Sequence, residues 1–396
     1  MRKMISLLLV LALLLAAVSA VAEGTVLDGK EDRKIQIHPA GENEVEEGVS
    51  PTTGRNLAEV GKNVREGFTG LAVTGQYMPV LVQISNADAG IGYRAPFYGA
   101  SADIIYQTLI YQNGGDRMTM LFSDVIPTYV GPVRSLRVTA LRIRQEWDCA
   151  VAYFNFSPAD IKGETARLKN LGLQGKFQFD GNGAMGTQKG ARVYGLKEPN
   201  NAVLCPQAYI EDKGLTDYVS RNHAFKFTDE KPQGGDEATF VFVDMGGKAK
   251  REYNSRLEYD EETNTYFRYL TKDNKPVVYS ELIPVGMERA KIDGDTMFKI
   301  KEMEPGEEID FSNVIVQFVD YVWPNGERPV PVLVGTGNAD YFMGGRHYAG
   351  VWKHDDDNSR TVYYGEDGNE IELQRGKTLV ILCDISRSAD QQISYE

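Results

Sequence analysis

Cysteine and histidine are scarce in this chain, which has 3 cysteines and 4 histidines among 396 residues. So few cysteines exclude the disulfide framework that holds many small secreted domains together, and their odd number leaves at least one thiol unpaired in a monomer. Cys149 and Cys383 each lie in an apolar, strand-like run, which favours buried thiols. No histidine lies within a few residues of any cysteine, so the sequence argues against a catalytic thiol and against a zinc site.

Positive charge is also in deficit: 43 lysines and arginines face 56 aspartates and glutamates, for a formal net charge of -13. Nonspecific binding to nucleic acids or anionic lipid surfaces needs clustered positive charge, so we expect no nucleic-acid partner. Phosphate-cradling loops are missing, and Gly335-Thr336-Gly337-Asn338 is predicted to be a turn rather than a dinucleotide fingerprint. The run His354-Asp355-Asp356-Asp357 lacks the spacing of a calcium loop and is predicted to be a solvated turn. We therefore expect no cofactor and no metal.

A long uncharged run lies near the start of the chain. Arg2 and Lys3 precede the apolar residues 4–18, and Ala20-Val21-Ala22 comes just before Glu23. This order predicts a secretory signal peptide over residues 1–22. An uncleaved N-terminal anchor is the alternative, although the apolar run is shorter than the roughly 20 residues that span a bilayer. We expect an exported protein, extracellular or in the cell envelope, with the membrane as a partner only if the signal segment is uncleaved. No cysteine lies near the cleavage site, which excludes a lipid anchor on a lipobox cysteine.

Composition and pattern divide the rest of the chain into three parts. Residues 23–67 contain no Phe, Tyr or Trp, so residues 23–76 are predicted to be a flexible linker. Residues 77–235 mix strand-like runs with helical patterns, whereas residues 236–390 show strand patterns and a hairpin signal at Asp367-Gly368. We therefore predict an α+β protein, with a mixed α/β N-terminal domain followed by a mainly β C-terminal domain. The predicted helices are 133–147 and 158–171, residues 181–190 are predicted to be a loop, and the predicted strands are 78–84, 102–110, 118–122, 149–154, 238–245, 251–259, 266–270, 314–322, 330–334, 361–364, 371–373 and 378–383.

Arginines gather at the start of the first predicted helix, which Gly131-Pro132 opens. Arg134 falls in its first turn and Arg137 lies one turn further on. Free backbone N–H groups at a helix N-terminus and guanidinium groups both favour anions, so this stretch is a candidate site for a carboxylate, phosphate or sulfate. The alternative is that these arginines pack on the surface and pair with nearby acids.

Several motifs resemble those of the YerB-like family of bacterial cell-envelope proteins, whose two halves are domains of unknown function. The most specific motif is Val130-Gly131-Pro132-Val133-Arg134-Ser135-Leu136-Arg137. The others in the first half are Asn86, Arg94-Ala95-Pro96, Ala102-Asp103-Ile104-Ile105-Tyr106 and Arg117. Those in the second half are Asn313-Val314-Ile315-Val316, Gly335-Thr336-Gly337, Tyr341-Phe342, Gly350-Val351-Trp352-Lys353 and Gly376-Lys377-Thr378.

The chain departs from the family pattern at positions suited to acid–base chemistry. Tyr106-Gln107 stands where the family usually has Tyr-Glu, and Tyr153-Phe154-Asn155 stands where it has His-x-Gly. The usual Glu-Gly-Gly-x-Thr-Arg becomes Gln112-Asn113-Gly114-Gly115-Asp116-Arg117. These changes weaken an enzymatic interpretation, while the retained arginines favour binding an anion.

Three hypotheses for function follow from the sequence and the resemblance. The leading one is a non-enzymatic envelope protein that binds an anionic ligand, such as a peptidoglycan stem peptide or another anionic envelope polymer, without catalytic residues. The alternatives are a cell-wall hydrolase or transferase that uses Asp103 as acid or base beside the arginines, and a scaffold whose β domain docks envelope proteins. The candidate ligand-binding residues are Asn86, Arg94, Asp103, Arg117, Arg134, Ser135 and Arg137.

Overall fold

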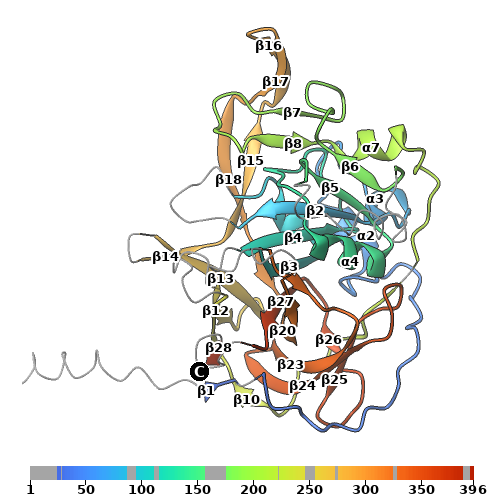
Figure 1. The fold of residues 1–396 in the computed structure, drawn as a ribbon, viewed down its shortest axis with the longest axis vertical. Coiled ribbons are helices and arrows are strands. Elements are labelled where there is room, and N and C mark those ends of the chain that lie inside the picture. Colours follow the sequence, from blue (N-terminus) through green and yellow to red (C-terminus); the bar gives the residue numbers. More distant parts are fainter. Residues whose placement is uncertain are drawn as a thin grey trace, which may run out of the picture.

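The computed structural model describes residues 25–27, 29–86, 95–110, 116–156, 175–221, 223–245, 255–272, 275–323, 328–386 and 393–396. Strands predominate over helices in these residues (Figure 1). The chain is therefore mainly β with a mixed sheet, and the predicted α/β character of the N-terminal half is weaker than its sequence pattern suggested. The second predicted helix, 158–171, lies outside the described residues.

An eleven-stranded mixed sheet forms the centre of the molecule, in the order β10-β24-β23-β20-β27-β3-β4-β2-β5-β6, with β25 paired to β24. Its central strands are apolar runs with every residue buried, which is typical of strands covered on both faces. The bounds are β2 (Val80–Ser85), β3 (Ile104–Leu109), β4 (Asp116–Phe122), β5 (Ala150–Tyr153), β6 (Gln178–Asp180), β10 (Asp236–Glu237), β20 (Asn313–Val319), β23 (Gly335–Met343), β24 (Arg346–His354), β25 (Val362–Gly365) and β27 (Thr378–Asp384).

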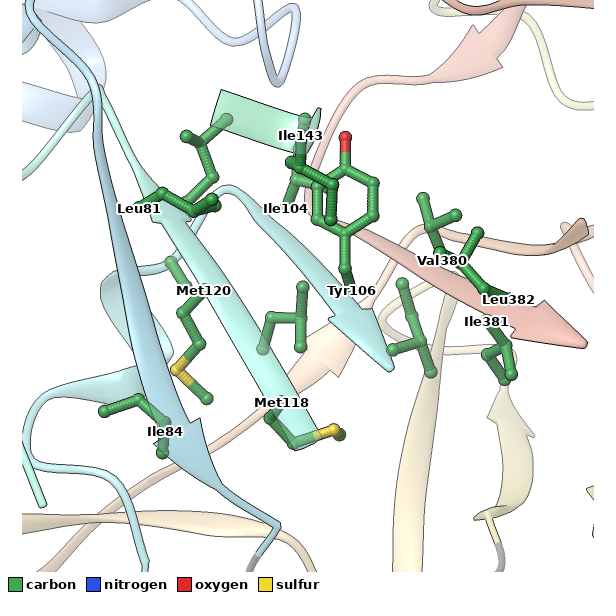
Figure 2. Packing of buried hydrophobic residues seen from close by; sticks show 14 of the residues in the cluster. Leu81, Ile84, Ile104, Tyr106, Met118, Met120, Ile143, Val380, Ile381 and Leu382 are labelled. Carbon is green, nitrogen blue, oxygen red and sulfur yellow. The ribbon is translucent and has the colours of Figure 1, made fainter. Parts of the chain in front are cut away.

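One strand pair joins the two halves of the chain. β27 runs parallel to β3, with Thr378 opposite Ile104 and Ile381 opposite Gln107. Figure 2 shows side chains from both halves packed together, including Ile104, Tyr106 and Val380. The two halves follow each other in the predicted order, and they share one sheet and one hydrophobic core.

A second sheet of seven strands lies beside the central one, in the order β1-β28-β11-β12-β13-β14, with β19 paired to β13. The remaining strands form five two-stranded pairs, of which β16 and β17 project at the top of the view (Figure 1). The bounds of the second sheet are β1 (Thr25–Val26), β11 (Phe240–Val243), β12 (Ser255–Asp260), β13 (Thr265–Lys272), β14 (Lys275–Val278), β19 (Asp310–Phe311) and β28 (Ile393–Tyr395). Those of the pairs are β7 (Gly190–Arg192), β8 (Ala202–Leu204), β9 (Phe227–Thr228), β15 (Ser280–Val285), β16 (Glu288–Ile292), β17 (Asp295–Lys299), β18 (Glu302–Glu308), β21 (Tyr321–Val322), β22 (Val330–Pro331) and β26 (Leu373–Gln374).

The helix predicted over 133–147 begins later, as α4 (Val138–Trp147). The preceding residues are extended because their backbone bonds to the ends of two strands: the Arg134 N–H donates to the Gln83 carbonyl at 2.7 Å, and the Phe154 N–H donates to the Arg134 carbonyl at 2.9 Å. The other helices are α2 (Leu57–Gly61), α3 (Leu71–Thr74), the 3-10 helix η2 (Gly99–Ser101) and α7 (Pro206–Asp212). None of the helices in the described ranges has the length and apolar character needed to cross a membrane.

Most of the predicted linker is ordered against the body of the protein. The Arg33 guanidinium donates to both carboxylate oxygens of Asp340, at 2.9 and 3.0 Å, and the Asn43 side chain donates to the Ala224 carbonyl at 2.9 Å. The segment contains no aromatic residue up to Gly67, and for this reason its composition indicates a linker. In the structure, specific polar contacts with residues distant in sequence hold it in place. The expectation of a flexible linker therefore differs from the structure over residues 29–76.

Smaller predictions have mixed outcomes. The three cysteines are buried and form no disulfide, as predicted for Cys149 and Cys383. The hairpin signal at Asp367-Gly368 is confirmed by a turn in which the Gly365 N–H donates to the Asn369 carbonyl at 2.9 Å. Gly335-Thr336-Gly337-Asn338, however, is not a turn but the start of β23, because β24 pairs with it along its whole length.

Candidate functional site

One edge of the central sheet collects most of the predicted site residues. β2, β5 and β6 run parallel, so their carboxyl ends meet at this edge, and β4 begins there because it is antiparallel to β2. Ser85 at the end of β2 lies opposite Arg117 near the start of β4. Ligands of open α/β sheets commonly bind outside the carboxyl ends of parallel strands.

Asn86 follows β2 directly and contacts the first residue of β4. Its side-chain nitrogen donates to the two carboxylate oxygens of Asp116, at 2.9 and 3.0 Å. Burial raises the pKa of Asp116, and the charge of Arg268 acts against this rise. The side-chain amide of Gln107 also donates to Asp116. A Glu at position 107, as in the family pattern described above, would place a second carboxylate next to Asp116. The buried side chains of Asn86 and Gln107 therefore hold Asp116 in place.

Three arginines reach this edge from β4 and from the extended segment before α4. The buried Arg117 guanidinium donates to the Ser135 carbonyl at 2.9 Å, and that of Arg134, which is partly buried, donates to the side chain of Asn200. Arg137 is the residue just before α4 and donates to the Leu136 carbonyl at 3.0 Å. The structure thus places Ser135 against Arg117 and keeps Arg134 and Arg137 in the adjoining extended segment. Asn86 contacts Asp116 instead, and because successive residues of a strand face opposite sides of the sheet, Asp116 and Arg117 extend to opposite faces. The structure does not place Arg134 in the first turn of a helix, so the predicted contribution of the helix dipole at that residue was wrong.

Asp103 lies at the other end of the same strands. It precedes β3, and its carboxylate accepts hydrogen bonds from Ser123, the residue after β4, whereas Arg117 is near the start of β4. Six residue steps along a strand separate these positions by roughly 20 Å. Arg94 lies outside the described residues. The acid–base hypothesis, which needs Asp103 beside the arginines of the candidate site, therefore lacks the arrangement that it predicts.

Asp103 belongs to a buried network that the sequence did not predict. Its Oδ2 atom accepts from the Ser123 N–H and hydroxyl, both at 2.6 Å, and from the Asp124 N–H at 3.0 Å. Asp124 in turn accepts from the hydroxyls of Ser50 and Thr53, both at 2.7 Å. Burial, together with the charge of Asp124, raises the pKa of Asp103 to about 8. The signal was present in Ser50-Pro51-Thr52-Thr53, a run of small polar residues within the predicted linker.

Two hollows in the described surface differ in shape and charge. One, of about 260 Å³, has as its charged lining residues Arg55, Glu59, Arg65, Asp103, Asp124, Glu281, Glu307 and Lys377. The other, of about 910 Å³, is an open groove beside β24. Its charged lining residues are Lys226, Asp236, Glu366, Asp367, Glu370 and Glu372. This acidic groove is unsuited to an anion, and neither hollow includes the arginines of the sheet edge.

Comparison with known proteins identifies the family but no activity. Residues 68–207 match the N-terminal domain, and residues 243–380 the C-terminal domain, of a protein of unknown function, DUF3048. The crystal structure of YerB protein from Bacillus subtilis has a similar fold, with a TM-score of 0.62 and 20% identity, over 87% of this chain and 99% of that one. No curated protein matches. Because the two domain matches cover more than half of the sequence, the chain belongs to the YerB-like DUF3048 family, whose function is unknown.

Proposed function

We propose that this chain is an exported cell-envelope protein that binds an anionic ligand through Arg117, Arg134 and Arg137. The observation that supports this is the position of three arginines in two segments, β4 and the extended stretch before α4, that meet at the carboxyl ends of β2 and β5. Ser135 lies in the same stretch as Arg134 and Arg137, and its carbonyl accepts a hydrogen bond from Arg117. The ligand would be an anionic envelope component, such as a peptidoglycan stem peptide or a phosphate-bearing polymer.

Guanidinium chemistry suits such a ligand. Arginine presents planar, paired N–H donors that match carboxylate and phosphate oxygens, and partial burial strengthens each contact by excluding water. The contacts with Ser135, Leu136 and Asn200 hold the arginines in place before a ligand arrives.

Replacement of Arg134 by Ala tests the anion site. Loss of one charge-assisted contact should weaken binding by about 1.5 to 3 kcal/mol, or roughly tenfold to a hundredfold. Isothermal titration with inorganic phosphate and with a peptidoglycan stem peptide measures this change. Arg256→Ala is the control, because Arg256 is exposed on β12 and pairs with Glu258. Equal affinities of Arg134→Ala and the parent protein, or no binding of either probe to the parent, would refute the proposal.

Export has its own test. The Ala20-Val21-Ala22 sequence predicts cleavage after Ala22, so N-terminal sequencing of material secreted by a bacterial host should find Glu23 first. Recovery of the uncleaved chain in the membrane fraction would instead favour the N-terminal anchor.

The scaffold hypothesis receives less support. The large apolar side chains that are exposed in the described residues are few, and of these only Val322 and Val332 belong to one strand pair, β21 with β22 and the residue after it: the full set is Val73, Phe156, Tyr194, Val219, Val277, Val322 and Val332. The edge strand β14 carries Lys275 and Pro276, both exposed, and such residues oppose the addition of a strand from another protein. The β-rich half therefore offers no evident docking surface in the described part of the chain.

A further inference from the structure

We propose that the cavity lined by Asp103, Asp124 and Arg55 is a second binding site, which takes a free α-amino acid. The ammonium group of the ligand would lie against the two carboxyl groups, and its carboxylate would bind Arg55. This site is at the opposite end of β3 and β4 from the proposed anion site, so either proposal can fail without the other.

The carboxyl end of the cavity is built and buried. Asp103 and Asp124 are only 4% and 3% exposed, yet both line the cavity. The Ser123 hydroxyl lies 2.6 Å from Asp103 Oδ2 and 3.5 Å from Asp124 Oδ1, so one hydroxyl connects the two carboxyl groups. The three hydrogen bonds that Asp103 accepts all go to Oδ2. Among the described residues Oδ1 accepts no hydrogen bond, which leaves this oxygen for a ligand in the cavity.

The two carboxyl groups lack a cation in contact with them. In the described part of the chain neither one forms an ion pair, and burial raises the pKa of both. A buried pair of carboxyl groups holds a proton because burial disfavours both charges and the two charges repel each other. The charge of Arg55 opposes the rise at Asp124 but does not cancel it. A ligand ammonium group would supply a compensating positive charge and displace the proton from Asp103.

Arg55 supplies a positive charge in the lining of the same cavity. Of the three cations that line it, Lys377 bonds to Asp310 at 2.5 Å and Arg65 lies 3.8 Å from Glu281. Arg55 makes no ion pair within the described ranges, and its charge acts on Asp124. It is thus the cation that remains for a ligand carboxylate. A volume of about 260 Å³ suits a molecule with a few heavy atoms, and excludes a polymer or a folded peptide.

The binding of an ammonium group has a distinctive dependence on pH. At pH 7 a site with a pKa of about 8 is mostly protonated, so binding should release close to one proton per ligand. Affinity should rise by up to tenfold per pH unit from pH 6 to 8 and level off above pH 8. A ligand that instead accepts a hydrogen bond from the protonated Asp103 would bind more weakly as the pH rises.

Isothermal titration of the full chain with glycine, L-alanine and D-alanine tests the proposal. Titrations in buffers of different ionisation enthalpy count the protons released. Lactate is the matched control ligand, because it replaces the amino group of alanine by a hydroxyl. We expect at least one of the amino acids to bind with proton release, and lactate to bind at least tenfold more weakly. Binding of none of the three amino acids, comparable affinity for lactate, or binding without proton release would overturn the proposal.

Two variants locate the site. Asp103→Asn keeps an oxygen that can accept the three hydrogen bonds but replaces the acid by an amide. Proton release on binding should therefore disappear, and the affinity for the amino acid should fall at least tenfold. Arg55→Gln should reduce affinity to a similar extent, while Arg256→Gln, on the distant β12, should leave it unchanged. Circular dichroism checks that each variant is folded. Unchanged binding by a folded Asp103→Asn or Arg55→Gln variant would place the amino acid elsewhere and reject this cavity.

Discussion

The carboxyl group of Asp103 makes the stability of this chain depend on pH. Its pKa in the folded state is about 8, against about 3.9 for an aspartate in an unfolded chain. The folded state therefore binds this proton more tightly, and the stabilisation is complete below pH 4 and lost as the pH rises through 8. We expect the free energy of unfolding to fall between pH 4 and 8, by at most about 1.4 kcal/mol per pH unit from this group.

Urea unfolding at a series of pH values checks this expectation, with Asp103→Asn as the comparison. The variant has no carboxyl group to titrate at this position, so its unfolding free energy should decline less than that of the parent from pH 5 to 8. Parallel pH profiles for the two proteins would mean that Asp103 is ionised in the folded state.

At the scale of residues, the sequence could group candidate residues only when they are adjacent in the chain. Arg134, Ser135 and Arg137 fall in one motif, whereas Arg117 was included only through the family resemblance, and its contact with the Ser135 carbonyl depends on the fold. The pairing of Asp103 with Asp124 could not be predicted in this way. It depends on the register of β3 against β4 and on hydroxyls from residues 50–53, which only the folded chain brings together.

Among elements, the N-terminal segment before β2 is held in part by a charged contact with a buried carboxylate. Arg33 is the cation that pairs with Asp340, whose side chain is fully buried. Arg33→Ala leaves this carboxylate with only His347 as a bonded side chain, so we expect a loss of about 3 kcal/mol in the free energy of unfolding. Limited proteolysis should also cut the segment faster.

An exposed pair in the same segment provides the control for this prediction. Lys62 and Glu59 lie on the surface of α2, so Lys62→Ala should change stability by less than about 0.5 kcal/mol. Similar urea midpoints for the two variants would contradict a structural role for Arg33.

Elements were predictable where local pattern and tertiary contacts agree. The apolar runs gave β2, β3, β4, β5, β20 and β27 within a few residues. The hairpin of β23 and β24, with nine residues in each strand, was missed. Its glycines and polar residues obscure the strand pattern in the sequence. The first turn of the predicted helix was lost for a different reason: residues 133–136 bond to β2 and to the end of β5, contacts that helical periodicity does not include.

For the whole molecule, the parallel pairing of β27 with β3 makes the halves depend on each other. The sequence predicts that residues 77–235 and 236–390 fold separately, but the shared sheet leads us to expect the opposite. Each piece alone would expose a long apolar strand edge, at β3 or at β27. Size-exclusion chromatography and circular dichroism should show aggregated or unfolded pieces alone and a folded complex after co-expression. Cooperative unfolding by 77–235 alone would contradict this dependence.

The same strand pair restricts the order in which parts of the protein can fold. Ile104 of β3 pairs with Thr378 of β27, so this pairing can form only after most of the chain has been synthesised. Contacts between such distant residues slow folding, because the entropy cost of closing a long loop comes before the strands can pair. We therefore expect the central sheet to close only once β27 has been synthesised, and the complete chain to fold more slowly than a protein whose strands pair with their neighbours in sequence.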